Sequence, residues 1–404
     1  MIQIRPQNLE LNRGMDHVLP PEEDDDIPAF CRALGVPGLA DIHTHFLPPR
    51  MLRRVWEYFD AAGPLVGVSW PIRYKWSDEE RVAHLRSMGV RMFSALAYAH
   101  RPDMAADLNA WTLAFARATP GCLPSATFYP EPGAARYVRA ALDAGARIFK
   151  VHLQVGGFPP DDPQLGEVWG LLAEAEVPVV VHAGHAPVGT EYTGPGPFGT
   201  LMARYPALTA IVAHLGAPDY GAFLRLAADY ERVALDTTMI FTGFLDRLAP
   251  FPDDALPLAR ELGLAGKILL GSDFPNIPYP YARQIAGLAR TGLGEAWLRA
   301  VCWENPVAMF GAAGSAEAGS AEAGSAEAGS AEAGSAEAGS AEAGQLKRGQ
   351  LKRGQLRRRP AADSSSVTRA RGRAGVRCPS RPVMSSLATS ALTTASSVAR
   401  TTAS

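Results

Sequence analysis

The chain has 404 residues, of which 47% are hydrophobic and 20% charged, and its formal net charge at pH 7 is −2. Residues 1–314 carry 34 acidic and 26 basic side chains, residues 315–344 carry six acidic ones, and residues 345–404 carry 13 basic and one acidic. The acidic main segment gives no electrostatic reason to expect nucleic-acid binding. No apolar run approaches the roughly 20 residues that cross a bilayer, so we expect no membrane span.

The N-terminus and the cysteines bear on the compartment. Residues 1–5 lack a basic start with a following apolar stretch, which argues against a signal peptide. The four cysteines show no Cys-x-x-Cys spacing, which argues against a disulfide framework or a thiolate zinc site; they are Cys31, Cys122, Cys302 and Cys378. We therefore predict a cytoplasmic protein.

Composition divides the chain into four segments. Residues 1–37 form an N-terminal extension, and residues 38–312 have a globular composition that suits one large α/β domain. Residues 313–344 hold six copies of Ser-Ala-Glu-Ala-Gly, and residues 345–404 are a basic tail; we expect both to be disordered. The pentamer period continues as Gln-Leu-Lys-Arg-Gly, which supports the hypothesis that the repeat slipped frame and that the tail is out-of-frame sequence.

Short apolar, β-branched runs alternate with amphipathic stretches from residue 38 onward. We predict strands at residues 38–42, 90–96, 123–128, 146–151, 177–182, 208–214, 233–236 and 267–271. Helical patterns lie between them at residues 105–118, 134–144, 164–175, 198–205, 220–230 and 253–262. The alternation predicts a parallel sheet, and eight strands favour a (β/α)8 TIM barrel over an open doubly wound sheet.

Histidines gather where these strands end. Seven of the nine lie at or just beyond the carboxyl end of a predicted strand, beginning with His43 and His45 in Asp41-Ile42-His43-Thr44-His45. Residues two apart on a strand share a face, so His43 and His45 can converge on one ion. Later strands end in Lys150-Val151-His152, Val181-His182, Ala213-His214, Leu235-Asp236 and Gly271-Ser272-Asp273. Barrel enzymes build their active sites at this face, so the clustering predicts catalysis.

Each of these residues also has a structural interpretation. A single histidine in an apolar run, such as His182 or His214, is most often a hydrogen-bonded core residue, and Asp273 in Gly-Ser-Asp-Phe-Pro suits a turn. Their joint occurrence at successive strand ends favours a site.

The chain resembles the amidohydrolase superfamily, in its amidohydrolase-2 branch of metal-dependent hydrolases and decarboxylases, over roughly residues 38–311. The resemblance rests on the strand-end motifs above, together with Ala213-His214-Leu215-Gly216, Gly271-Ser272-Asp273-Phe274-Pro275 and Glu304-Asn305-Pro306. It implies one divalent ion, with Zn²⁺ favoured, held by His43, His45, His182 and Asp273. It also implies that His214 acts as general acid/base or as an electrophile, that Asp273 shuttles a proton, and that Asp41 is structural or supports the ligands.

Lys150 and His152 share a face of their strand, and two roles remain open for them. In the mononuclear branch the resemblance implies that both contact substrate, which we prefer. In the binuclear branch a carboxylated Lys150 would bridge two metals, with His182 and His214 on the second.

Residues 46–89 separate the first two strands by more than a usual βα connection. They include Trp56, Tyr58, Trp70, Tyr74 and Trp76. The segment is either a lid with aromatic and cationic contacts to substrate or an extra helix packed on the barrel.

The leading functional hypothesis is a metal-dependent hydrolase that directs activated water at a carbonyl-type C–O or C–N bond of a small molecule. The alternative is a non-oxidative decarboxylase or hydratase of an aromatic or unsaturated acid, since decarboxylases of this branch often carry a carboxylate at the position of Asp41. A second alternative is a non-catalytic ligand-binding barrel. The oligomeric state, including a homo-oligomer, stays open.

Overall fold

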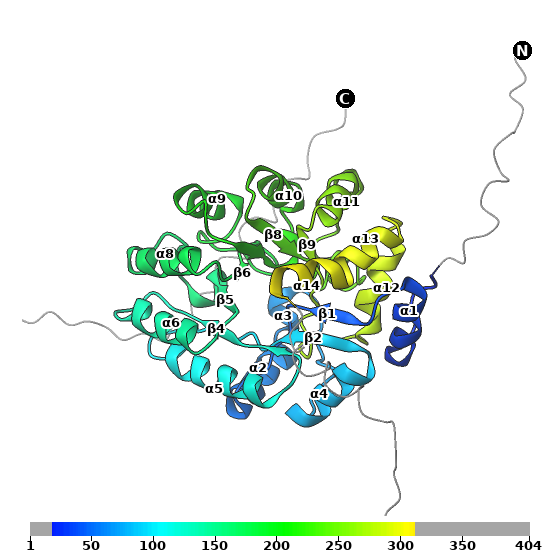
Figure 1. Cartoon of the computed structure of the whole chain (residues 1–404), viewed down its shortest axis with the longest axis horizontal. Helices are drawn as coiled ribbons and strands as arrows, with labels where there is room; N and C mark the ends of the chain where they lie inside the picture. The colour runs from blue at the N-terminus through cyan, green and yellow to red at the C-terminus, as the bar shows by residue number, and fades with distance from the viewer. Residues whose placement is uncertain (1–17, 312–404) are drawn as a thin grey trace, which may run out of the picture. The chain divides into compact units, whose positions relative to one another are not determined.

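Parallel strands close into a barrel in the computed structural model, which describes residues 18–311 (Figure 1). The strands are β1 (Leu39–Asp41), β2 (Val90–Ser94), β3 (Cys122–Leu123), β4 (Ser125–Thr127), β5 (Ile148–His152), β6 (Val179–His182), β7 (Ala210–Val212), β8 (Val233–Asp236) and β9 (Ile268–Leu269). Consecutive strands pair in parallel except across Pro124, which separates β3 from β4 and has no N–H to donate. The ring closes where the Ile42 N–H donates to the Leu270 carbonyl (2.9 Å). The predicted TIM barrel is confirmed; the predicted disordered tail lies outside the described residues.

The helices of the described residues are α1 (Ile27–Leu34), α2 (Pro49–Ala61), α3 (Gly63–Val66), α4 (Asp78–Ser87), α5 (Ala105–Ala118), α6 (Ala134–Asp143), α7 (Leu153–Gly156), α8 (Gly166–Glu174), α9 (Pro195–Arg204), α10 (Tyr220–Asp229), α11 (Leu256–Leu264), α12 (Ala282–Arg290), α13 (Glu295–Arg299) and α14 (Asn305–Phe310). The six predicted helices correspond to α5, α6 and α8–α11, which ring the strands in Figure 1. The charged α4, begun by a capping box of Ser77 and Glu80, lacked the apolar periodicity that predicts a helix.

Apolar side chains fill the inside of the barrel. The inward-facing set includes Ile42, Ile148, Val180, Ile211 and Leu269, all fully buried. Phe310 of α14 packs with this set, and α14 lies across the end of the barrel that faces the viewer in Figure 1. One end of the barrel is therefore plugged by apolar packing, which leaves the opposite, carboxyl end of the strands for polar groups.

Several predicted strand ends are wrong by one or two residues, and the strand predicted at residues 123–128 is divided into β3 and β4 at Pro124. The difference that bears most on the polar strand ends is at His214. The strand predicted at residues 208–214 ends at Val212, and His214 and Leu215 have left-handed backbone conformations with φ of 56° and 49°. The His214 N–H donates to Asp236 Oδ1 (3.0 Å) instead of continuing a ladder. The chain therefore turns at His214, because the Asp236 carboxylate at the end of β8 accepts a hydrogen bond from its N–H.

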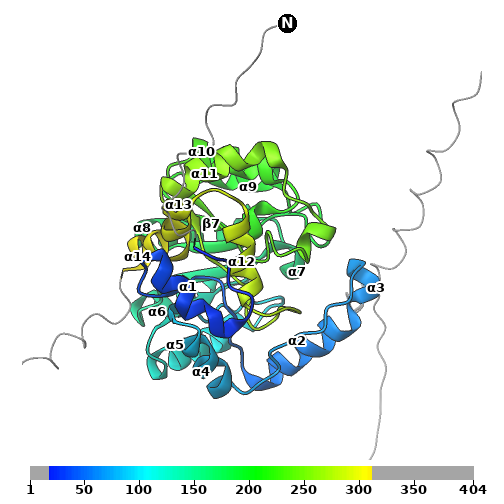
Figure 2. The ribbon, with the colours of Figure 1, turned by 90° about the vertical axis from the view of Figure 1, so that its right-hand side faces the viewer.

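The long connection between β1 and β2 carries α2, α3 and α4. Figure 2 shows α2 running away from the barrel body with α3 at its far end. Trp70, which follows α3, packs against Phe59 (5.0 Å) and Phe244 (4.9 Å) and donates its Nε1–H to the Asn276 carbonyl (2.7 Å). The segment thus contacts the loops after β8 and β9, at the carboxyl end of the barrel.

The structure bears on two expectations from the sequence, the absence of a disulfide framework and the absence of a membrane span. Cys31, Cys122 and Cys302 are buried and form no disulfide there. Among residues 18–311, no helix combines the length and the apolar character needed to cross a membrane.

The segment before β1 is fastened to the barrel by Asp24. This buried carboxylate accepts hydrogen bonds from the Tyr74 hydroxyl (2.6 Å), from His84 Nε2 (2.9 Å) and from the Ala282 N–H (2.8 Å). Its three partners belong to the β1–β2 connection, α4 and α12, so one side chain joins parts of the chain that are more than 250 residues apart.

Asp24→Asn is expected to lower the free energy of unfolding at pH 7 by about 1–3 kcal/mol. The amide oxygen is a weaker acceptor than a carboxylate oxygen, and the amide NH2 group would face partners that themselves donate. Urea denaturation measures the change. Asp25→Asn is the matched control, because Asp25 is the next residue and its side chain is exposed.

The effect of Asp24→Asn should depend on pH. Burial raises the pKa of Asp24, but the hydrogen bonds from His84, Tyr74 and the Ala282 N–H outweigh it and leave the pKa below the ordinary 3.8. A carboxylate with a lowered folded-state pKa stabilises the fold above its unfolded pKa, and that stabilisation is lost as the pH falls through the folded value. The difference between wild type and variant should be full at pH 7 and shrink below about pH 4; a difference that stays constant down to pH 2 would contradict this account.

Candidate metal centre

His43 and His45 follow β1 and are both buried. His43 Nδ1 lies 2.8 Å from Asp236 Oδ2, and His45 Nδ1 lies 2.8 Å from the Leu96 carbonyl. Both partners are acceptors, so each imidazole carries a proton on Nδ1, and in the neutral form of each ring the lone pair is on Nε2. The two rings, 5.2 Å apart at their centroids, therefore present unprotonated Nε2 atoms from one strand end.

The Nε2 atoms of His43 and His45 both face the Asp273 carboxylate. Asp273 Oδ1 lies 2.8 Å from His45 Nε2 and 3.6 Å from His43 Nε2. Lone pairs that face a carboxylate oxygen repel it unless a positive charge lies between them. Imidazole nitrogen and carboxylate oxygen are ligands for Zn²⁺ and its neighbours in the first transition row, so this donor set fits a divalent cation.

His214 lies beside the same group. One nitrogen each from His43 and His214 and one oxygen from Asp273 lie within 4.8 Å of one another. His214 Nδ1 faces the Thr238 carbonyl (3.1 Å), so its lone pair is on Nε2. His214 and Asp273 both have a positive φ (56° and 70°), a conformation that costs energy in residues other than glycine. Hydrogen bonds to Asp236 and to the His43 carbonyl hold these two backbones in place.

Asp236 is the site residue that the predicted ligand set missed. Its Oδ2 accepts from His43, and its Oδ1 accepts from the N–H groups of His214 (3.0 Å) and Thr238 (3.1 Å). The sequence did hold a signal, because Asp236 ends a predicted strand in the same way as the assigned residues. Hydrogen bonds of this kind, from a ligating histidine to a carboxylate, fix ring orientation and tautomer.

His152 and His182 are aligned because β5 and β6 pair with these two residues opposite each other. Their rings are stacked at 3.8 Å and 10°. His182 Nε2 faces the Ala186 carbonyl (2.9 Å), so its lone pair is on Nδ1, whereas His152 Nδ1 accepts from the Val155 N–H. The structure brings His182 within 4.8 Å of the His214 ring (centroid to centroid). The predicted role of His182 as a ligand stays a prediction.

Lys150 is buried and points its Nζ at His43 Nε2 (3.1 Å). Burial lowers the pKa of Lys150 to about 8, although Asp236 and Asp273 oppose that shift. The lysine therefore brings a hydrogen-bond donor next to the lone pair of His43. Its predicted contact with substrate, and that of His152, remain predictions.

The protonation states suit a cation. Burial, and then the Lys150 charge, lower the pKa of His43 to about 3, and burial likewise lowers the pKa of His182 and His214. Neutral imidazoles and an ionised carboxylate at pH 7 are the states that metal binding requires.

Asp41 and Tyr98 lie next to the metal-centre histidines. Asp41 is fully buried, and it accepts from Ser272 Oγ, from the Tyr281 hydroxyl (2.8 Å) and from the His43 N–H (3.1 Å). Its oxygens are therefore engaged within the wall of the barrel. Tyr98, which the sequence analysis did not single out, lies between the rings of His45 (6.1 Å) and His152 (5.1 Å).

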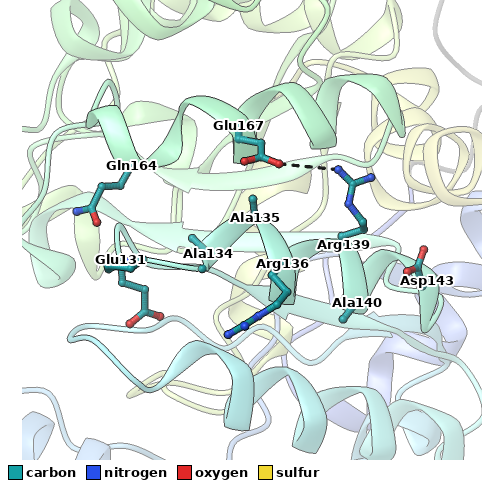
Figure 3. A pocket seen from close by; sticks show the side chains of 11 residues that line it. Glu131, Ala134, Ala135, Arg136, Arg139, Ala140, Asp143, Gln164 and Glu167 are labelled. Carbon is teal, nitrogen blue, oxygen red and sulfur yellow. Dashed lines mark ion pairs between the residues drawn. The ribbon is translucent and has the colours of Figure 1, made fainter.

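A groove of about 550 Å³ opens on the outer surface between α6 and α8. Its walls include Glu131, Arg136 and Gln164, and Figure 3 shows Glu167 pointing toward Arg139 across the groove (3.9 Å). This ion pair is largely exposed, and the lining contains none of the residues of the metal centre. The groove is a solvated gap between neighbouring helices, and it is separate from the candidate metal centre.

Comparisons with known proteins identify the family and the fold of the chain. The family model described as Amidohydrolase matches residues 40–312. An uncharacterised TIM-barrel protein from Bordetella bronchiseptica has a similar structure (TM-score 0.55, 19% identity, 68% of this chain and 100% of that chain), as has a zinc-bound amidohydrolase from Burkholderia multivorans (TM-score 0.50, 16% identity, 68% and 99%). At these identities the two structures show a shared fold. The search of curated proteins found no match.

Asp236→Asn is expected to weaken zinc binding about 10–100-fold, because an amide holds the Nδ1–H of His43 less firmly than a carboxylate does. Competition with a chromophoric chelator measures the dissociation constant. Asp229→Asn, an exposed change of the same kind at the end of α10, should bind like wild type. Equal affinity in the Asp236 variant and wild type would contradict the role assigned to this carboxylate.

Proposed function

The chain belongs to the amidohydrolase family, in its amidohydrolase-2 branch, and from this premise we propose that it is a metal-dependent hydrolase of a small molecule. The proposed reaction is attack of activated water on a carbonyl-type C–O or C–N bond. The proposed cofactor is one divalent ion, Zn²⁺ in preference to others, held by His43, His45, His182 and Asp273.

One observation supports this proposal most strongly. The Nε2 lone pairs of His43 and His45 and the ionised Asp273 face one another in a buried place, and each imidazole has its proton engaged on the far nitrogen. Burying such a group without a cation is costly, because the His45 lone pair and the Asp273 charge lose water and face each other, whereas the His43 lone pair has the Lys150 Nζ beside it. A non-catalytic barrel has no need for this arrangement.

A divalent ion bound there would polarise a carbonyl oxygen and lower the pKa of bound water toward neutrality. His214 supplies a base, because the Thr238 carbonyl fixes its proton on Nδ1 and leaves Nε2 free to accept one. Asp273 is the second group that holds or passes a proton. Lys150 and the Nε2–H of His152 are donors for an acceptor group of the substrate.

Decarboxylation of an aromatic or unsaturated acid is the second candidate. The observation that favours it is the buried Lys150, since a substrate carboxylate would neutralise its charge. The two reactions need different substrates but share the same proposed ligands. Asp41 adds no support, because its oxygens are engaged by Ser272, Tyr281 and the His43 N–H.

The experiment that tests the proposal uses the purified full-length chain, depleted of metal with a chelator and then reloaded with zinc. Hydrolysis is followed with a panel of lactones, aryl esters and amides, and carbon dioxide release with a panel of aromatic acids. Zinc-dependent hydrolysis supports the proposal. Zinc-dependent carbon dioxide release alone would favour the second candidate, and failure to bind zinc would contradict both.

His214→Asn is expected to lower kcat about 10²–10⁴-fold while the zinc content stays at one ion per chain, because the variant loses a base and keeps the proposed ligands. Steady-state kinetics and elemental analysis of the same sample measure the two quantities. His100→Asn, which alters an exposed histidine, is the control. Loss of zinc together with activity would show that His214 is a ligand, and would contradict the role proposed for it.

A further inference from the structure

The loop after β6, residues 183–194, begins directly after His182 and folds back on itself. The Gly194 N–H donates to the Ala183 carbonyl (2.6 Å), which closes the loop at its base. The His185 imidazole fills the interior, since a Cβ added at Gly189 or at Gly194 would overlap the atoms of its ring. The loop therefore takes its shape around one histidine side chain.

The His185 side chain is hydrogen-bonded to the segment that follows the next strand, β7. His185 Nδ1 lies 2.5 Å from Asp219 Oδ2, and Asp219 directly precedes α10. A second link runs beside it, where the Ala186 N–H donates to the Ala217 carbonyl (2.9 Å). The loop after β6 is thus held to the segment after β7 by one hydrogen bond between side chains and one between backbone groups.

The same loop determines how His182 is presented. The Ala186 carbonyl, one residue after His185, faces His182 Nε2 at 2.9 Å. Because a carbonyl only accepts, this contact puts the proton of His182 on Nε2 and its lone pair on Nδ1. Among the residues that the structure describes, Ala186 is the hydrogen-bond partner found for the His182 ring.

We propose that His185 and Asp219 are positioning residues that hold the Ala186 carbonyl against His182 and so fix its ring and its tautomer for binding a metal ion. The proposal rests on the proposed function, in which His182 is a ligand. Neither side chain touches the ion or the substrate in this account. Outer hydrogen bonds to ligating histidines contribute about 10–100-fold to metal affinity, and here that contribution passes through a loop instead of a direct contact.

The test compares zinc dissociation constants of the full-length chain in wild type, His182→Ala, His185→Ala and Asp219→Ala. We expect His182→Ala to weaken binding most, and the other two to weaken it about 10–100-fold. Asp219→Asn retains an acceptor for the Nδ1–H of His185, so it should restore most of the affinity lost in Asp219→Ala. Glu191→Gln, an exposed change in the same loop, is the matched control and should bind like wild type.

Two further measurements separate positioning from general loss of structure. The thermal midpoint without metal reports whether a variant folds, and the visible spectrum of the cobalt-loaded protein reports the coordination geometry. Normal folding with weaker binding and an altered cobalt spectrum in His185→Ala supports the proposal. An unchanged zinc dissociation constant in both alanine variants, while His182→Ala loses affinity, would overturn the positioning role and leave the proposed function standing. Wild-type affinity in His182→Ala would overturn both His182 as a ligand and the residues proposed to act through it.

Discussion

The Asp236 carboxylate accepts a hydrogen bond from His43 with one oxygen, and from the backbone N–H groups of His214 and Thr238 with the other. These contacts determine which nitrogen of His43 carries the proton and hold His214 in its left-handed conformation. The orientation of the metal centre therefore depends on a side chain that belongs to neither the predicted ligands nor the predicted base. Because Asp236 ends β8, the barrel itself places this carboxylate, and ligand geometry follows from strand register.

Burial determines the protonation states of the polar groups at the carboxyl end of the barrel. Five imidazoles, one lysine and two carboxylates lie together at the carboxyl end of the barrel, and each would be costly alone in an apolar interior. Asp236 and Asp273 oppose the burial that lowers the pKa of Lys150, while the lysine charge and burial together keep His43 neutral. The groups compensate one another only in part, since the lone pairs of His43 and His45 still face Asp273. The proposed metal ion supplies the positive charge that this arrangement lacks.

Much of this could be predicted from the sequence, because strands alternating with helices and polar residues at strand ends are local patterns. The barrel and the family were predicted and are confirmed. The predicted strands overlap the observed ones, but the strand predicted at residues 123–128 is divided at Pro124, because proline has no N–H to donate. The position of Asp236 at a strand end was visible in the sequence, but its role was not, because that role depends on a contact with His43, 193 residues away. The strand end at His214 was wrong for the same reason, since a carboxylate from another strand captures its N–H. The tautomers of His43, His45 and His182 likewise depend on partners that only the fold brings near.

We propose that one divalent cation binds where His43, His45 and Asp273 converge. X-ray absorption at the zinc edge, on the full-length chain reloaded with one equivalent of zinc, measures the ligands of that ion. We expect a first shell of nitrogen and oxygen ligands at about 2.0–2.2 Å with no sulfur. We also expect the imidazole contribution to fall when His43 and His45 are both replaced by alanine. A shell that contains sulfur, a second zinc scatterer at about 3.5–4 Å, or a spectrum unchanged by the double replacement would contradict it.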